Sequence, residues 1–391
     1  GGEWKVNKQR LSWDILDSFQ EAAVELGIPK IDDFNEGNNY GVSYFKVNQN
    51  SGFRWNTVKA FIKPIKNRKN LHIIKKCEVN NLILENNKVI GVDVKRNGNF
   101  EKFFVNKEII LSSGSIGTPK ILELSGIGNP KILSNLGIET KVKSINVGEN
   151  LQDHLQLRVI YKLENALTLN QKANSLLGKM AIGLEYALKR TGPMSMAPSQ
   201  LGVFAMSDQS YETPNLQFHV QPLSLDKFGD PLHDFPGLTA SVCNLNPQSR
   251  GSVHITSKDA KLAPAIDPKY LSEEQDRIVA AQSIRLARKI IAQPSMEKFN
   301  PQEQAPGIQF QSDEELKKVA GDIGTTIFHP VGTCAMGPSI SSVTDSELKV
   351  RGVDGLRIAD ASVMPTITSG NTNAPTLMIA EKASEMILNS Y

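Results

Sequence analysis

The sequence predicts an α/β protein of two lobes, the second with α+β character, and three features of the 391-residue chain support this prediction. Consecutive strand patterns in residues 71–111 lead into a helix, which is typical of an α/β lobe. Residues from about 160 to 325 mix alternating segments with a long helical pattern, as in an antiparallel sheet with helices on one side. A chain of this length can also bury a large core.

The first lobe is predicted to open with a helix and to continue with strands. Apolar residues recur at helical spacing from Leu11 to Leu26, and Gly27 with Pro29 ends that pattern. Asn86-Asn87 and Asn97-Gly98 supply the hairpin turns between strand patterns. The predicted strands are residues 72–75, 81–84, 89–94 and 103–111.

A strand–turn–helix unit follows. Residues 108–111 run through Ser112, Ser113 and Gly114 into a helix that is predicted to begin near Thr118-Pro119. The N-terminus of such a helix could face a cofactor, because its free N–H groups favour an anion. An ordinary connection between a strand and a helix fits the same residues.

The second lobe carries alternating segments and one long helix. The turn-rich apolar loop at residues 192–198 is typical of a pocket lining, although methionines in such a run usually serve packing. The predicted strands are residues 216–220, 238–243 and 250–255, and the predicted helix is residues 273–291.

Composition excludes several classes of protein. A net charge of +3 and a pI of about 8.5 indicate no special affinity for nucleic acid. No apolar run is long enough to predict a transmembrane helix. The three cysteines lack C-x-x-C spacing and the six histidines lack ligand spacing, so neither a disulfide framework nor a metal site is predicted.

The segment FHPVGTCAMG, residues 328–337, is the most informative part of the chain. His329 can exchange a proton near neutral pH, and Pro330 with Gly332 fixes the backbone around it. Asn373, in the run SGNTNAP before an apolar helical pattern, could orient or polarise an oxygen beside this histidine. The residues alone also fit a hydrogen-bonded loop histidine and an asparagine that caps a helix.

Four motifs in order resemble the signatures of the glucose–methanol–choline (GMC) flavoprotein oxidoreductases, and the resemblance covers nearly the whole chain. The segment at residues 328–337 with Asn373 resembles the C-terminal signature, and the wording of SGNTNAP is most like that of insect members. The other three are GSIGTPKILELSGIG at residues 114–128, NVGENLQDH at 146–154 and GLRIADAS at 355–362.

This resemblance implies an FAD-dependent enzyme that oxidises the CH–OH group of a small-molecule alcohol. His329 would be the catalytic base, and Asn373 would contact both the substrate oxygen and the cofactor. Val79 would lie against the adenine of FAD, and Asp360 with Ala361 would contact the cofactor where a strand meets a helix. The implied domains are residues 1–160 and 326–391 for FAD and residues 161–325 for the substrate.

One departure from the family is plain, because no G-x-G-x-x-G fingerprint for the FAD pyrophosphate occurs in these residues. We therefore expect an FAD-binding domain that is incomplete at its N-terminus, and weak FAD binding by residues 1–391 alone. A non-catalytic GMC-like binding protein is the alternative, and a nicotinamide dehydrogenase is less favoured. The electron acceptor (oxygen or another) and the compartment stay open; secretion is compatible with the resemblance, and no signal peptide occurs in these residues.

Overall fold

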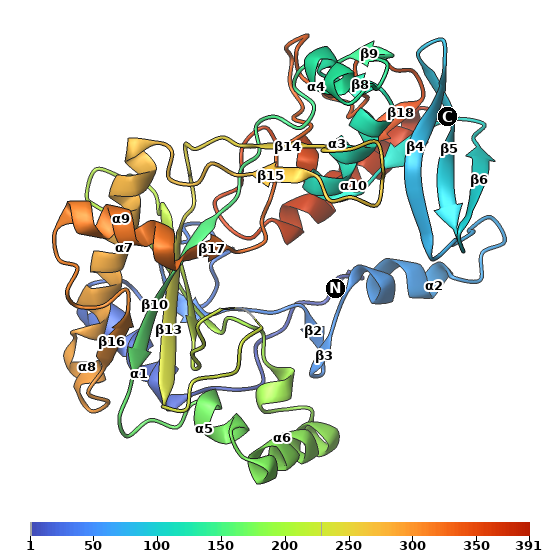
Figure 1. The fold of residues 1–391 in the computed structure, drawn as a ribbon. Helices are drawn as coiled ribbons and strands as arrows, with labels where there is room; N and C mark the ends of the chain where they lie inside the picture. Colours follow the sequence, from blue (N-terminus) through green and yellow to red (C-terminus); the bar gives the residue numbers. More distant parts are fainter. Residues whose placement is uncertain (1, 228) are drawn as a thin grey trace. The chain divides into compact units, whose positions relative to one another are not determined.

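The computed structural model describes residues 2–227 and 229–391, which form two compact units (Figure 1). Unit 1 contains Gly1–His72, Leu155–Leu245 and Glu274–Thr325, and unit 2 contains Ile73–His154, Asn246–Glu273 and Thr326–Tyr391. Each unit therefore combines segments that are distant in the sequence. The domains expected at residues 1–160, 161–325 and 326–391 concern function, and they stay predictions beside this division by packing.

Unit 1 is organised around a seven-stranded sheet with the order β1-β11-β12-β13-β10-β16, and β17 also pairs with β10. Neighbouring strands along that path are antiparallel, which confirms the antiparallel sheet predicted from the alternating segments. The strands are β1 Gly41–Tyr44, β10 Leu155–Lys162, β11 Leu201–Ala205, β12 Leu216–Gln221, β13 Gly237–Asn244, β16 Gln302–Ala305 and β17 Gly324–Thr326.

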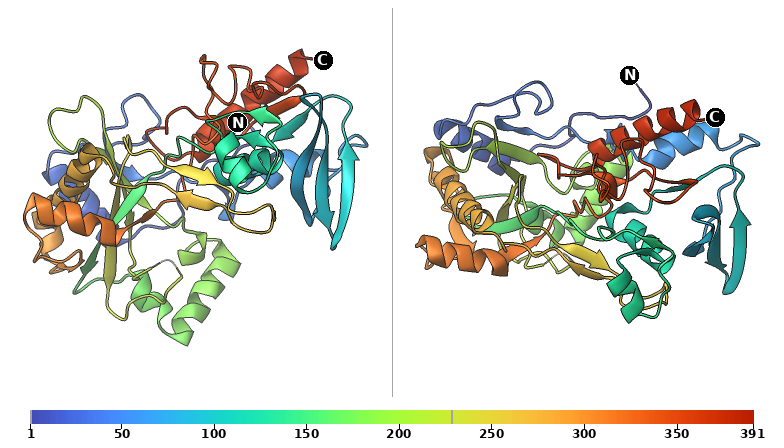
Figure 2. Two further views of the ribbon diagram at one scale, coloured as in Figure 1. Left: turned by 45° about the horizontal axis from the view of Figure 1, so that its top comes forward. Right: turned by 90° about the horizontal axis from the view of Figure 1, so that it is seen from above.

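Helices α7 (Glu274–Ile291) and α9 (Asp313–Ile323) pack on one side of this sheet (Figures 1 and 2). The predicted first helix is α1 (Asp14–Glu25), and Gly27 ends it with a φ of +91°. None of the helices in the described ranges is both long and apolar enough to cross a bilayer. The remaining elements of unit 1 are β2 Gln49–Asn50, β3 Phe53–Arg54, η1 Val58–Ile62, α2 Lys63–Ile65, α5 Leu169–Ala173, α6 Leu176–Lys189, η2 Pro193–Ser195 and α8 Pro294–Glu297.

Unit 2 contains an antiparallel three-stranded sheet and several short strand pairs. Strands β4 (Cys77–Glu85), β5 (Lys88–Arg96) and β6 (Asn99–Phe104) form a meander whose turns use positive φ at Asn86, Asn87, Asn97 and Gly98, as predicted. The other elements are β7 Ile109–Leu111, α3 Gly114–Leu124, β8 Ile127–Gly128, α4 Pro130–Asn135, β9 Val142–Lys143, β14 Ser252–His254, β15 Ala265–Asp267, β18 Leu356–Ile358, η3 Ala361–Val363 and α10 Asn373–Asn389.

Three predicted elements of unit 2 are wrong in detail. Residues 72–75 form no strand, and the expected strand at 103–111 is two strands with different partners. Strand β6 pairs with β5 antiparallel, whereas β7 pairs with β18 parallel. Helix α3 begins at Gly114 rather than near Thr118-Pro119, because the N–H of Gly114 donates to Asp360, which is remote in the sequence.

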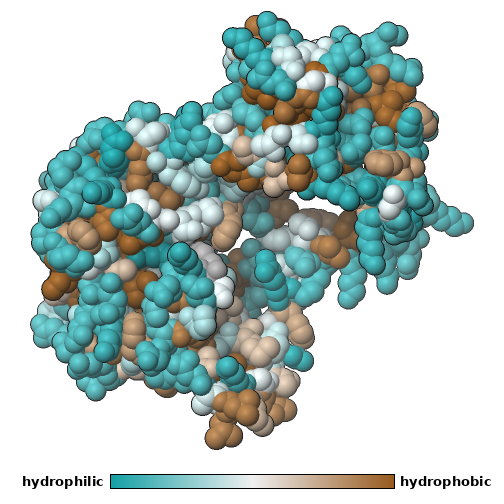
Figure 3. All heavy atoms as spheres, in the orientation of Figure 1, coloured by the Kyte–Doolittle hydropathy of each residue, from teal (hydrophilic) through white to brown (hydrophobic). Residues whose placement is uncertain are grey.

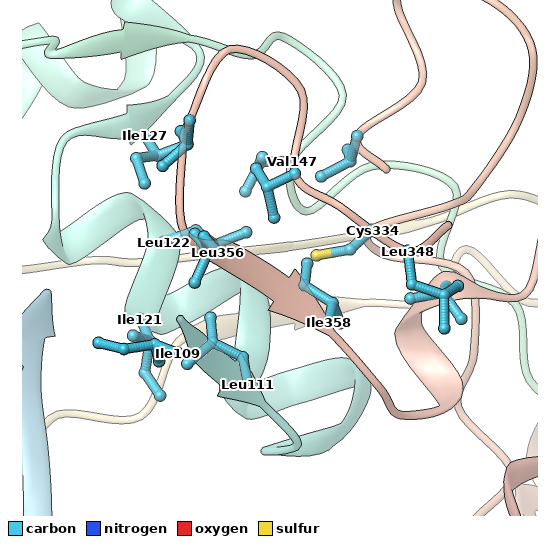
Figure 4. Packing of buried hydrophobic residues seen from close by; sticks show 14 of the residues in the cluster. Ile109, Leu111, Ile121, Leu122, Ile127, Val147, Cys334, Leu348, Leu356 and Ile358 are labelled. Carbon is cyan, nitrogen blue, oxygen red and sulfur yellow. The ribbon is translucent and has the colours of Figure 1, made fainter. Parts of the chain in front are cut away.

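The core of unit 2 surrounds the parallel pair β7 and β18 (Figure 4). Ile109 and Leu111 of β7 and Leu356 and Ile358 of β18 are buried, and α3 contributes Leu122 to the same cluster. Burying these aliphatic side chains contributes about 1.5–3 kcal/mol each. This cluster fixes the ends of β7 and β18, from which the functional loops leave.

A buried carboxylate also ties α3 to β14 in unit 2. The side chain of Glu123, on α3, accepts hydrogen bonds from Nδ1 of His254 at 2.7 Å and from the N–H of Ile255 at 2.8 Å. Nε2 of His254 lies 3.1 Å from Glu149. Hydrogen bonding to Glu123 outweighs burial and raises the pKa of His254 above its ordinary value.

We predict that this cluster makes stability depend on pH. Because the folded-state pKa of His254 is raised, its contribution is fully present below the unfolded value of about 6.5 and is lost as the pH rises through the folded value. Thermal melts of the wild type and His254→Gln should therefore differ most below about pH 6.5 and converge at alkaline pH. His72→Gln, at an exposed histidine, is the control, and a difference that grows with pH would refute the assignment.

Candidate functional site

His329 lies in the loop after β17, and unit 2 holds its backbone firmly. The N–H of His329 donates to Oδ1 of Asp153 at 2.9 Å. The carbonyl of Pro330 accepts a hydrogen bond from the hydroxyl of Ser115 on α3 at 2.7 Å. Hydrogen bonds therefore hold the backbone of the loop at His329 and at Pro330, and they fix the position from which the imidazole side chain extends.

The imidazole of His329 lies between two polar side chains of unit 2. Its Nδ1 is 3.1 Å from Nδ1 of His154, and its Nε2 is 3.1 Å from Nδ2 of Asn371. The two imidazole rings meet edge to face, with an angle of 85° between their planes. Only 8% of the surface of His329 is exposed, and His154 is fully buried.

These contacts favour one tautomer of His329. An amide nitrogen only donates, so Nδ2 of Asn371 facing Nε2 assigns a lone pair to Nε2 and the proton to Nδ1. In this tautomer the proton on Nδ1 faces Nδ1 of His154, which would accept it. Burial disfavours the imidazolium and lowers the pKa of His329, and the nearby Asp153 carboxylate opposes that shift. His329 is therefore a neutral base at neutral pH.

Asp153 is the residue around which this arrangement is built. Its Oδ2 accepts hydrogen bonds from the hydroxyls of Tyr270 and Thr326, and its Oδ1 accepts the N–H of His329. Burial, together with the carboxylate, raises the pKa of Tyr270 well above its ordinary value, so Tyr270 is a permanent donor here. One carboxylate therefore joins the segment at 153–154, the loop that carries His329 and the residue Tyr270.

The structure brings Asn371, not Asn373, to His329. Asn373 is the exposed first residue of α10, and no hydrogen bond joins its side chain to His329 among the described residues. Between the two asparagines, Thr372 is buried, and its carbonyl accepts hydrogen bonds from Thr376. The SGNTNAP run holds both asparagines, and its residue types alone do not say which of them the turn presents to the histidine.

Asp360 and Ala361 lie where β18 ends, opposite the start of α3. Oδ2 of Asp360 accepts from the N–H of Gly114 at 2.9 Å and from the hydroxyl of Thr118 at 2.6 Å. Its Oδ1 accepts the N–H of Ser362 at 2.8 Å, which caps η3. The carboxylate is thus committed to holding two turns together, and Ala361 follows directly in η3.

Helix α3 also carries a substitute for a missing hydrogen bond. Pro119 lies inside α3 and has no N–H for the carbonyl of Ser115, one turn earlier. The hydroxyl of Thr333 donates to that carbonyl at 2.7 Å. Because Thr333 belongs to the FHPVGTCAMG segment, this bond joins α3 to the loop that carries His329.

Val79 lies on β4, which pairs with β5. The register of this pair shifts between Val79 and Asn81, so Val79 stands beside an irregularity in the ladder. Its side chain is half-buried and packs against the core of unit 2. Among the described residues, no hydrogen bond or packing contact joins Val79 to His329, His154 or Asn371.

Comparison with known proteins identifies the motifs. A family model described as GMC oxidoreductase matches residues 5–156, and a second model with that description matches residues 247–380. An alcohol dehydrogenase (acceptor) of Pseudomonas putida is 37% identical over 99% of this chain and 70% of its own length. An oxygen-dependent choline dehydrogenase of Photobacterium profundum is 35% identical over 96% of this chain and 66% of its own length. The chain thus spans about two thirds of these relatives.

The solved structures include a formate oxidase of Aspergillus oryzae, from a study of FAD modification. Its TM-score is 0.92 at 25% identity, covering 100% of this chain and 73% of that one. The mixed α/β fold and the antiparallel sheet of unit 1 are those of the GMC flavoenzymes, as predicted.

We predict that His254 and His329 titrate in different pH ranges. Nuclear magnetic resonance of labelled imidazoles should place the pKa of His329 below about 6.5 and that of His254 above it. Asp153→Asn removes the charge that favours the imidazolium, so the pKa of His329 should fall further. Assignment by His329→Gln makes the test direct, and a pKa that rises in Asp153→Asn would contradict the geometry.

Proposed function

Because the chain belongs to the GMC oxidoreductase family, whose members are FAD-dependent flavoproteins that act on alcohols, we propose a specific reaction with named residues. The protein oxidises the CH–OH group of a small-molecule alcohol, and His329 removes the hydroxyl proton. The observation that carries this proposal is the nearly buried imidazole of His329, held with Nδ1 beside His154 and Nε2 beside Asn371.

The residues of unit 2 fit the flavin part of FAD. Helix α10 starts at Asn373 beside Asn371, and Thr372 makes no side-chain capping bond, so the free N–H groups of the first turn carry partial positive charge. Such an end suits a ring system that gains negative charge on reduction. We propose that Asn373 and Ala361 contact FAD, that the backbone of Val79 lies against the adenine, and that Asp360 holds the start of α3 in place.

FAD, when bound, supplies the acceptor for the hydride that leaves the alcohol carbon. Nε2 of His329 takes the hydroxyl proton, since burial keeps the imidazole neutral and this nitrogen carries the lone pair. Nδ2 of Asn371, displaced from Nε2 by the substrate, donates to the substrate oxygen as that oxygen gains negative charge. Donors placed in advance in this way contribute about 2.7–4 kcal/mol to transition-state stabilisation.

His154 is proposed as the positioning residue for the base. It accepts the Nδ1 proton of His329, which keeps the lone pair of His329 on Nε2. When His329 becomes an imidazolium, both of its N–H groups have acceptors in reach, one at His154 and one at the substrate oxygen. Asp153, bonded to the backbone of His329, adds a negative charge that favours this state.

We propose a subfamily from the sequence and a substrate class from the relatives. The resemblance of the SGNTNAP segment to insect members stays a proposal that rests on its wording alone. The relatives named as choline dehydrogenase and alcohol dehydrogenase support a small hydroxyl compound as the substrate. No observation favours a non-catalytic role for this His329 arrangement.

We predict that His329→Ala in the full-length enzyme lowers kcat by roughly 10²–10⁴, the usual loss for a general base. Absorption near 450 nm, which reports bound oxidised flavin (an approximate value for flavins in general), should persist, because the histidine serves the substrate. Steady-state kinetics and an absorption scan measure the two effects. Turnover close to wild type would overturn the proposal, whereas loss of flavin alone would leave it to be repeated with His329→Gln.

We also predict that the two asparagines differ. Asn371→Ala should lower kcat by about 10²–10³-fold, since it removes the donor beside Nε2. Asn373→Ala should lower kcat less and should instead weaken flavin binding. Asn373→Ala is the matched control for Asn371→Ala, because the two asparagines are separated by one residue. Equal losses of kcat in both variants would count against the assignment to Asn371.

A further inference from the structure

Helix α6 of unit 1 is held to the protein by one side only. Ser175 caps its start by accepting the N–H of Gly178 at 3.0 Å, and Arg190 ends it in the left-handed region. The hydroxyl of Tyr186 donates to the carbonyl of Gly52 at 3.1 Å, and the guanidinium of Arg190 lies 4.7 Å from the ring centre of Phe53. These contacts fix the orientation of α6 about its own axis.

The opposite face of α6 is apolar and exposed. None of the helix residues is buried. Spacings of four residues from 176 to 188, with residue 177 beside them, place the exposed residues on one face of the helix. They are Leu176 (76% exposed), Leu177 (79%), Met180 (62%), Leu184 (61%) and Leu188 (74%). Figure 3 shows brown side chains gathered over α6 at the lower edge of the view.

The segment that carries this apolar face is basic, although Lys172 lies 4.7 Å from the ring centre of Trp13 and Arg190 packs on Phe53. Residues 172–190 contain Lys172, Lys179, Lys189 and Arg190 but only one acidic residue, Glu185, which gives this segment a net charge of +3. The carboxylate of Glu185 accepts a hydrogen bond from the hydroxyl of Thr191 at 2.9 Å, so it turns towards the protein. A helix with an apolar face and cationic flanks is the pattern of a helix that lies in a membrane interface.

We propose that α6 docks on an anionic lipid bilayer, with its leucines inserted at the boundary between headgroups and acyl chains. The helix has 14 residues and a length of about 21 Å, which is short for a hydrocarbon core of about 30 Å, so it lies in the surface and does not span it. A second copy of this chain is disfavoured as the occupant, since a two-fold contact through α6 would bring the same cations together.

Vesicle co-sedimentation of the full-length protein tests this proposal. The wild type should sediment with vesicles rich in an anionic phospholipid and much less with purely zwitterionic vesicles, and added salt should weaken the binding. Leu177→Ser/Leu184→Ser/Leu188→Ser should lower the affinity at least about tenfold, because inserted apolar area drives binding. Lys179→Gln/Lys189→Gln should remove most of the preference for anionic lipid.

The matched control, Phe100→Ser/Phe104→Ser/Ile340→Ser, replaces three exposed apolar residues of unit 2. This variant should bind vesicles like the wild type. Leu184→Trp gives a second readout, an emission shift to shorter wavelength on adding anionic vesicles. Failure of the wild type to sediment, or equal sedimentation of the leucine variant, would overturn the proposal. A dimer in light scattering that the leucine substitutions dissociate, without vesicle binding, would assign the face to a second copy and overturn it too.

Discussion

The carboxylate of Asp153 is the constraint on which the rest of the candidate site depends. It accepts the N–H of His329 and the hydroxyls of Tyr270 and Thr326, so one buried group orients the loop of the base. A buried carboxylate stays in place because leaving any of its donors unpaired would cost roughly 1–3 kcal/mol. Its charge also opposes the lowering of the pKa of His329 that burial causes.

A second set of bonds connects this loop to the parallel pair at the core. The hydroxyl of Thr333 replaces the hydrogen bond that Pro119 cannot make, and the carboxylate of Asp360 joins the start of α3 to the end of β18. Each bond joins segments more than 200 residues apart in the sequence. The motifs of the family are therefore neighbours in space because they satisfy one another's polar groups, and this explains how α3 tolerates Pro119 in its interior.

Features that depend on neighbouring residues could be predicted from the sequence, whereas features that depend on contacts between distant segments could not. Asn86-Asn87 and Asn97-Gly98 were predicted as turns because their tolerance of positive φ is a local property. The split of residues 103–111 could not be predicted, because the partner of β7 is β18, near the other end of the chain. The choice between Asn371 and Asn373 also depends on a contact 42 residues away, which residue type does not encode.

The central claim is that an alcohol binds where Nε2 of His329 and Nδ2 of Asn371 converge. A crystal structure of the full-length protein with FAD and an unreactive alcohol analogue tests it most directly. The account predicts a hydroxyl oxygen within about 2.6–3.2 Å of both nitrogen atoms, with His154 still bonded to Nδ1 of His329. A hydroxyl held by other residues, or a His329 ring turned away from His154, would contradict it.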